Sequence, residues 1–397
     1  MGGGLLQLVA YGAQDVYLTG NPQITFFKVV YRRHTNFALE SIQQTFNGTV
    51  GFGQRVTATV SRNGDLISRA YLNLKITKGD ANNKLVPYVG LKAIKYAEVE
   101  IGGQKIDKHY SDWMYIWNEL SMPVGKKEGY FEMVGGKGGS LDGTSLYVPL
   151  EFWFCRNIGL ALPLIGLQYH EVKIVVQFEE PGKVHDGGSE GTLSGSLWID
   201  YIYLDTDERR KFAQSSHEYL IEQLQFTGRE KASSKMKLNF NHPVKELVWV
   251  LHKDGVGSTD ADWFNYTATG LGSGNANNYD TLSGVLGPAG SKARLFKEAK
   301  LILNGNDRFY ARDSRYFNLV QPFQHHENVP NNVGINVYSF ALKPEEHQPS
   351  GTLNMSRIDT AILDIKDPVA NTEISIFAVN YNVLRILSGM GGIAYSN

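Results

Sequence analysis

A short stretch near the C-terminus concentrates side chains that could perform acid–base chemistry. Residues 339–359, SFALKPEEHQPSGTLNMSRID, contain the carboxylates Glu345 and Glu346, the imidazole of His347 and the hydroxyl of Ser350. General acid–base catalysis requires such groups to converge on one reacting atom. Consecutive side chains of an extended chain diverge, so catalysis here would need partners from elsewhere. We predict that this stretch is not catalytic.

Two prolines favour a structural interpretation of the same stretch. Pro344 and Pro349 restrict the backbone to few conformers, and Gly351 follows in a turn that leads into the next strand. We hypothesise that these three residues set the path of the loop, while residues 345–347 lie on or near a surface or subunit contact. The structural loop comprises Pro344, Glu345, Glu346, His347, Pro349, Ser350, Gly351, Arg357 and Asp359.

Metal and phosphate sites are not supported by spacing. The chain has no His-x-His pair, and the adjacent His325 and His326 would face opposite ways on a strand. The segment VGGKGGS, residues 134–140, lacks the Ser or Thr after Lys137 that a phosphate-binding loop needs. We therefore expect no catalytic residue, metal or cofactor, and no enzymatic activity.

Composition limits the class of protein. Hydrophobic residues make up 42% and charged residues 20% of 397 residues, which is typical of a globular chain. The formal net charge of −1 argues against direct binding of nucleic acid, which usually requires a basic surplus. The lone Cys155 allows no intramolecular disulfide, as in a reducing cytosol. No apolar run approaches the length of a membrane span, and no secretory signal is expected.

Strand patterns dominate the chain. Alternating or β-branched runs predict strands over residues 55–62, 69–77, 171–180 and 196–205. One amphipathic pattern predicts a helix over 110–121. The chain is therefore predicted to be mainly β-structure.

The two halves of the chain repeat the same order of patterns. Residues 97–113 and 299–317 each give a strand, a glycine turn (Gly103, Gly305) and a polar stretch. Four further strand patterns follow the same order in both halves, joined near the charged segment 206–219. We predict an all-β fold of two tandem eight-stranded antiparallel jelly rolls with long loops and a few short helices.

Two insertions break this repeat. Residues 125–145 and 254–291 are rich in Gly, Ser, Asn and Asp and predict long surface loops. The second carries Trp263, Phe264 and Tyr266, which predicts that part of it is packed. It also carries the sequon at Asn265, a possible site of glycan attachment.

Several long motifs resemble one viral family. They include GAQDVYLTGNPQITFFKVVYRRHTNFALESIQQTFNG from Gly12, IGGQKIDKHYSDW from Ile101 and LALPLIGLQYHEVKI from Leu160. Residues 217–228, 339–359 and 379–397 add further matches. Together they are similar to the major capsid proteins of large icosahedral nucleocytoplasmic double-stranded DNA viruses, the double jelly-roll type of algal chloroviruses and iridoviruses.

The resemblance implies a structural role. Members of the family form pseudo-hexagonal homotrimeric capsomers that tile an icosahedral shell, with outer loops facing the host. It implies as partners neighbouring capsomers, minor capsid and penton proteins and an internal viral membrane nearby. It also implies late expression, a location in the virion and assembly in host cytoplasm.

The resemblance also implies a division of the chain, and one rival function stays open. The expected parts are an N-terminal arm (1–26), a first jelly roll (27–210), a linker (211–222) and a second jelly roll (223–397). The rival is a glycan-binding jelly-roll attachment protein of the virion, because the aromatic and acidic segment 260–266 could contact a sugar.

Overall fold

A computed structural model describes most of the chain and divides it into two compact units. The described residues are 3–23, 29–80, 83–136, 138–139, 141–186, 191–254, 263–267 and 294–395. One unit ends at Phe37 and the other runs from Ala38 to Asn397. The first contains α1 (Gly3–Val9) and α2 (Val16–Thr19). The second contains both jelly rolls.

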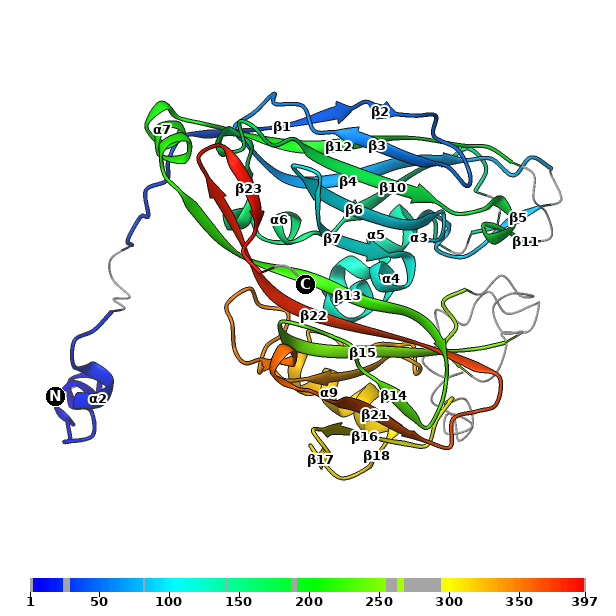
Figure 1. The fold of residues 1–397 in the computed structure, drawn as a ribbon. Helices are drawn as coiled ribbons and strands as arrows, with labels where there is room; N and C mark the ends of the chain where they lie inside the picture. The colour runs from blue at the N-terminus through cyan, green and yellow to red at the C-terminus, as the bar shows by residue number, and fades with distance from the viewer. Residues whose placement is uncertain are drawn as a thin grey trace. The chain divides into compact units, whose positions relative to one another are not determined.

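The first jelly roll has two antiparallel sheets packed against each other (Figure 1). Sheet 1 has the order β1-β12-β4-β8 with β9 on β4, and sheet 2 has the order β2-β3-β10-β6-β7. A small ribbon pairs β5 with β11. The strands are β1 (Phe37–Gln44), β2 (Phe46–Asn47), β3 (Arg55–Thr59), β4 (Leu66–Ile76), β5 (Lys84–Leu85), β6 (Ile94–Ile101), β7 (Gln104–Tyr110), β8 (Ser145–Leu150), β9 (Leu162–Pro163), β10 (Val172–Phe178), β11 (His185–Asp186) and β12 (Leu193–Leu204).

The second jelly roll repeats this plan. Sheet 3 has the order β13-β22-β15-β19, with β20 on β15 and β23 on β22, and sheet 4 has the order β14-β21-β16-β17, with β18 on β16. The strands are β13 (His217–Lys231), β14 (Lys235–Lys237), β15 (Pro243–Lys253), β16 (Glu298–Leu303), β17 (Asn306–Asp307), β18 (Arg312–Asp313), β19 (Asn336–Ser339), β20 (Leu353–Asn354), β21 (Ala361–Lys366), β22 (Thr372–Leu387) and β23 (Met390–Ile393).

Short helical segments fill the connections. In the first roll and at the join they are α3 (Val89–Lys92), α4 (Ser111–Ser121), α5 (Val124–Met133), α6 (Trp153–Arg156), η1 (Ile158–Leu160), η2 (Leu164–Gly166), η3 (Pro181–Lys183) and α7 (Thr206–Gln214). In the second roll they are η5 (Tyr316–Val320), α9 (Gln321–His325) and η6 (Met355–Arg357). Among the described residues, none of the helices has both the length and the apolar character needed to cross a bilayer.

Side-chain alternation explains the packing of the sheets. In β4, Ala70, Leu72 and Leu74 are at most 2% exposed, whereas the residues between them, such as Tyr71 and Asn73, face away from this core. This period of two is the signal that predicted the strand. The same reasoning predicted β3, β10 and β12, which the structure confirms within a few residues at each end.

The internal repeat is confirmed in detail by the hairpin turns. Gly102 and Gly103 (φ 58° and 82°) join β6 to β7, and Asn304 and Gly305 (φ 48° and 81°) join β16 to β17. Two left-handed residues form the turn that matches the twist of a hairpin, and Gly-Gly and Asn-Gly both adopt it readily. The two halves thus form the same type of hairpin turn with Gly or Asn followed by Gly.

A β-bulge also recurs. Ser68 of β4 has no partner in the ladder with β12, and Lys245 of β15 has none in the ladder with β22. On one side of each bulge a short strand is added, β9 opposite Ile67 and β20 opposite Val244. Counted from the bulge, β4 and β15 are therefore equivalent residue by residue.

The two insertions differ from the predicted loops in different ways. The prediction of a surface loop over 125–145 is wrong in its first half, because α5 forms there and buries Tyr130. Residues 263–267 of the second insertion are described, and Phe264 and Tyr266 are each 1% exposed, so its predicted packed part is confirmed. The rest of 255–293 lies outside the described residues.

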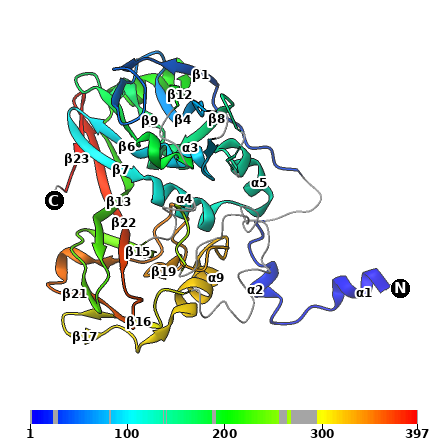
Figure 2. The same ribbon diagram turned by 90° about the vertical axis from the view of Figure 1, so that its right-hand side faces the viewer.

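The two rolls share part of one hydrophobic core. One face of sheet 3 contributes Leu247, Trp249 and Ile376 to the core of its own roll. The opposite face contributes Val248, Val337 and Phe377 to the cluster that also contains the core of the first roll. We call this contact the seam; α4, α6 and β7 of the first roll lie on it (Figures 1 and 2). The two rolls are therefore packed through apolar side chains as well as joined by α7.

Candidate functional site

The predicted loop connects β19 to β20, and Glu345 points into the molecule. Its Oε1 atom lies 2.7 Å from Nδ1 of His326 and accepts a hydrogen bond from the backbone N–H of Glu327 at 3.1 Å. Pro344 is buried beside it. The loop is thus attached to the residues that follow α9.

The other members of the loop diverge. Glu346 pairs with Lys343 at 2.8 Å on the surface, and His347 is half-buried. Ser350 closes the loop, since its Oγ accepts from the Lys343 N–H at 2.9 Å. Gly351 has φ 140°, and a Cβ there would lie 2.8 Å from the Phe340 carbonyl oxygen. Pro349, Arg357 and Asp359 are exposed, as are Glu346 and Gly351.

His326 lies between two carboxylates inside the second roll. Its Nε2 is 3.0 Å from Oε2 of Glu246, opposite the contact with Glu345, and the side chains of His326 and Glu246 are both 0% exposed. Burial lowers the pKa of His326, but the two carboxylates outweigh it and raise that pKa to about 9. The same imidazolium holds the pKa of Glu246 below its usual value, against the opposing effect of burial. His326 is therefore a cation that joins β15 to the loop.

A second buried group of charges crosses the seam. Lys245 Nζ lies 2.7 Å from Oε1 of Glu222, whose Oε2 accepts from Arg156 Nη1 at 2.9 Å. Glu222 is on β13 and Arg156 on α6, so the group links the two rolls. Burial lowers the pKa of Lys245, and the carboxylates of Glu222 and Glu246 oppose this. Removing one partner would leave an uncompensated buried charge, which is costly.

Sequence reasoning missed this network. Its only local signal is a pair of charges, Lys245 and Glu246, inside the apolar run of β15. On a regular strand these neighbours would face opposite sides. The partners Arg156, Glu222 and His326 come from distant parts of the chain, so only the fold brings them together.

Helix α4 is held at both ends by the second roll. Near its start, Asp112 pairs with Arg229 at 3.2 Å and accepts a hydrogen bond from the Tyr266 hydroxyl at 3.2 Å. At its end, Asn328 donates its side-chain amide to the Leu120 and Met122 carbonyls, which satisfies carbonyls that a helix terminus leaves free. The helix is thus a clamp between the rolls.

Burial at the first end of this clamp keeps a histidine neutral. His252 Nε2 lies 3.9 Å from Oδ2 of Asp112. Burial lowers the pKa of His252 to about 4, despite the nearby Asp112 carboxylate. At neutral pH His252 is thus uncharged, whereas His326 is a cation.

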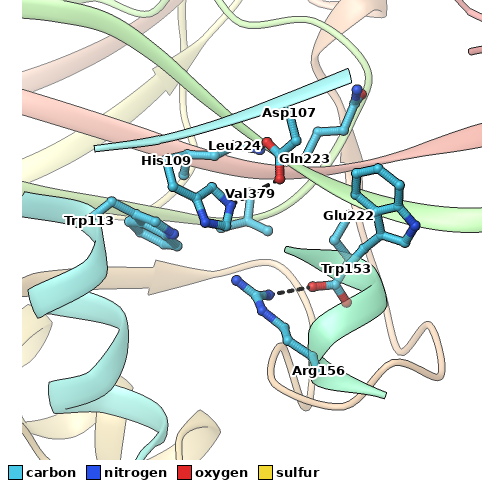
Figure 3. Close-up of a pocket in the computed structure, with 9 residues that line it drawn as sticks. All are labelled: Asp107, His109, Trp113, Trp153, Arg156, Glu222, Gln223, Leu224 and Val379. Carbon is cyan, nitrogen blue, oxygen red and sulfur yellow. Dashed lines mark hydrogen bonds and ion pairs between the residues drawn. The ribbon is translucent and has the colours of Figure 1, made fainter. Parts of the chain in front are cut away.

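The seam contains a small cavity, drawn in Figure 3. Asp107, His109 and Trp113 line it from the first roll, and Glu222 and Val379 from the second. Asp107 Oδ2 lies 2.9 Å from His109 Nε2, and its Oδ1 accepts from the Leu224 N–H at 2.9 Å. The volume of about 10 Å³ is roughly the room of one water molecule, so the cavity is too small for a substrate.

The role of these buried polar groups is structural. Throughout the part of the chain that the structure describes, no three or more His, Cys, Asp or Glu side chains are grouped to hold a metal ion. Burial raises the pKa of the Cys155 thiol to about 12, which leaves it a poor nucleophile at neutral pH. The charged groups instead bind elements of the two rolls to one another.

Comparisons with known proteins agree with this architecture. Residues 25–205 match the family model "Major capsid protein N-terminus", and residues 208–392 match "Large eukaryotic DNA virus major capsid protein". The chain is 54% identical to the major capsid protein of Pyramimonas orientalis virus and 46% identical to that of Paramecium bursaria Chlorella virus 1, each over 100% of both chains.

Solved structures give the same result for the fold. The crystal structure of PBCV-1 VP54 matches with a TM-score of 0.80 and 41% identity, covering 94% of this chain and 100% of that one. The Faustovirus major capsid protein matches with a TM-score of 0.75 at 13% identity, over 95% of this chain and 94% of that one. The predicted double jelly roll and the resemblance are confirmed, and the chain belongs to the major capsid proteins of large eukaryotic DNA viruses.

Proposed function

We propose that three copies of this chain close into a pseudo-hexagonal capsomer that tiles the shell of the virion. The observation that carries the proposal is the repeat: two rolls of the same strand order, packed through one seam. Three such chains supply six similar β-units around one axis, and hexagonal units tile a flat facet. The proposed role is structural, without enzymatic activity or a cofactor.

The test is the mass of the purified protein by size-exclusion chromatography with light scattering. We expect a species of three times 44.2 kDa that resists dilution. A stable monomer at micromolar concentration would contradict self-assembly into a capsomer.

Further proposals concern the parts of the chain and their partners. We propose an arm (1–26), a first roll (27–210), a joining segment (211–222) that holds the end of α7 and the start of β13, and a second roll (223–397). The partners are neighbouring capsomers, minor capsid and penton proteins and a nearby internal membrane, with no direct contact to nucleic acid. Assembly takes place in host cytoplasm, late in infection.

The loop of residues 344–351 is proposed as a structural element near a subunit contact. Its support is the exposed pair Lys343–Glu346 beside the inward Glu345. The triple variant Glu345→Ala, Glu346→Ala, His347→Ala is expected to lower trimer yield. Unchanged yield and stability would remove the contact from the proposal.

Glycan attachment at Asn265 is proposed as the modification to look for. Asn265 is half-buried, and its Oδ1 accepts from the Thr267 N–H at 3.0 Å. Mass spectrometry of the peptide that contains residues 263–267, from protein made in infected cells, tests the site. An unmodified peptide would contradict it.

A further inference from the structure

The seam inside the chain has an uncovered counterpart on the surface of sheet 1. Counted from the bulged residues Ser68 and Lys245, Tyr71 of β4 is equivalent to Val248 of β15. Tyr71 lies opposite Trp198 in its ladder, and Val248 lies opposite Phe377. Trp198 is therefore the counterpart of Phe377, which is fully buried in the seam.

The uncovered face is aromatic. The ring of Tyr71 is stacked on Trp198 at 6.5 Å between centroids and lies 6.2 Å from Tyr147. Tyr147 is 41% exposed, and Leu39, on the neighbouring β1, is 54% exposed. In sheet 3 the equivalent face carries Val248 and Phe377, and Trp113 of α4 covers it with 5.5 Å between its ring and that of Phe377. We call Tyr71, Tyr147 and Trp198 the sheet 1 face.

The helix that would cover such a face also has a counterpart. Both helical segments begin at a buried serine, Ser111 for α4 and Ser314 for the segment that continues through η5 and α9. Counted from these serines, Trp117 and Leu120 of α4 lie at the same distance along the segment as Val320 and Phe323, although η5 is a π-helix and its wider turns change the direction in which the later side chains point.

The exposure of these positions is opposite in the two rolls. Trp117 is 4% and Leu120 0% exposed, whereas Val320 is 39% and Phe323 79% exposed. Leu342, 71% exposed, lies beside them, because its carbonyl is 2.9 Å from Nδ1 of His325 at the end of α9. We call Val320, Phe323 and Leu342 the α9 patch. The α9 patch exposes apolar side chains, whereas α4 packs its apolar side chains on a sheet.

We propose that the α9 patch of one copy packs on the sheet 1 face of a second copy, as α4 packs on sheet 3 within the chain. The inference rests on the proposed capsomer and names the surfaces that form it. The two surfaces differ, so the contact is head-to-tail and repeats until it closes. A closed ring of three copies, as in the proposed capsomer, requires this contact to turn each copy by one third of a revolution relative to the next.

Two single variants test the contact from its two sides. Phe323→Glu and Tyr147→Glu each place a charge in one surface, and both positions are exposed enough for the free chain to fold. The matched control is Tyr169→Glu, an exposed aromatic residue (75%) outside both surfaces. We expect each test variant to raise the concentration at which half the protein is trimeric by at least about 30-fold, and the control to leave it unchanged.

Mixing the two variants distinguishes a head-to-tail contact from a general loss of assembly. The Phe323→Glu chain retains an intact sheet 1 face, and the Tyr147→Glu chain retains an intact α9 patch. These two unmodified surfaces can still form one contact between the two variants. We expect each variant alone to be monomeric and the equimolar mixture to give a dimer of twice 44.2 kDa. Trimeric wild type together with trimeric variants would overturn the contact but leave the capsomer intact. A monomeric wild type would overturn both.

A crosslink covers the case in which a charged variant fails to fold. The double variant Phe323→Cys, Tyr147→Cys is expected to form disulfides between chains that run as a covalent trimer, whereas Tyr169→Cys with Phe323→Cys is not. Cys155 does not interfere, because burial raises the pKa of its thiol to about 12. A trimer that forms no crosslink under oxidation would contradict the contact.

Discussion

Sheets 1 and 3 have the same strand order and the same bulge, yet one is open to the surrounding medium and the other is buried on both sides. Sheet 3 places Val248 and Phe377 against α4, whereas sheet 1 places Tyr71 and Trp198 on the surface. The strand pattern is therefore independent of what covers the outer face. A duplicated β-unit can therefore keep its inner core while its outer face differs according to what packs on it.

We expect the largest effect on stability from a substitution at Phe377, compared with the same substitution at its counterpart Trp198. Phe377→Ala empties a fully buried site in the seam and is expected to lower the free energy of unfolding by about 3–5 kcal/mol. Trp198→Ala, at the half-buried counterpart, is expected to cost clearly less in a monomeric background such as Phe323→Glu. Chemical denaturation followed by fluorescence measures both. Equal losses would mean that the two faces are equally covered in the free chain.

The buried charges of the second roll should show in the pH dependence of its stability. The folded-state pKa of His326 is about 9, above its ordinary 6.5, so its stabilisation is complete below about pH 6.5 and is lost as pH rises through 9. From this shift we expect about 2–3 kcal/mol at neutral pH. The measurement is the free energy of unfolding of wild type and His326→Gln from pH 6 to 10. The two curves should converge at high pH; a constant difference would show that His326 does not carry this charge.

The clamp on α4 should contribute a smaller amount. Asn328→Ala leaves the Leu120 and Met122 carbonyls without their side-chain donor and is expected to cost about 1–2 kcal/mol. Asn306→Ala, at the exposed start of β17, serves as the control. Thermal unfolding measures both variants. A loss no larger than that of the control would show that the seam does not depend on this cap.

The smallest effect is expected at the surface of the predicted loop. Glu346→Ala removes only the exposed pair with Lys343, so the midpoint of thermal unfolding of the free chain should not change measurably. Glu345→Ala, at the preceding residue but paired with His326, should lower it. If the two variants behave alike, the inward contact of Glu345 is not part of the folded core.

Much of the fold could be predicted from local patterns. The alternation in β4 and β12, the amphipathic α4 and the glycine turns at Gly103 and Gly305 each act within a few residues of the chain. Their shared order revealed the repeat. The packed aromatic residues Phe264 and Tyr266 were also predicted, because large apolar side chains in a polar loop are stable only when buried.

The charged sites and helix α5 depend on contacts between residues that are far apart in the sequence, and no local sequence pattern indicates such contacts. Glu345 and Glu346 are neighbours with the same side chain, and only the position of His326 directs one inward while the other remains with Lys343. The helix α5 formed where glycine content predicted a loop, since Tyr130 is buried against the first roll.

The amino-acid sequence alone was enough to predict the main strands, helix α4, the duplication and the family, because these follow from the order of residue types along the chain. The folded arrangement of the chain is what brings Lys245, Glu222 and Arg156 together at the seam and leaves Trp198 half-buried and Phe323 exposed. The physical reason is that burial depends on which surfaces lie opposite each other. Two stretches with equivalent patterns acquire different environments when only one of them has a neighbour within the chain.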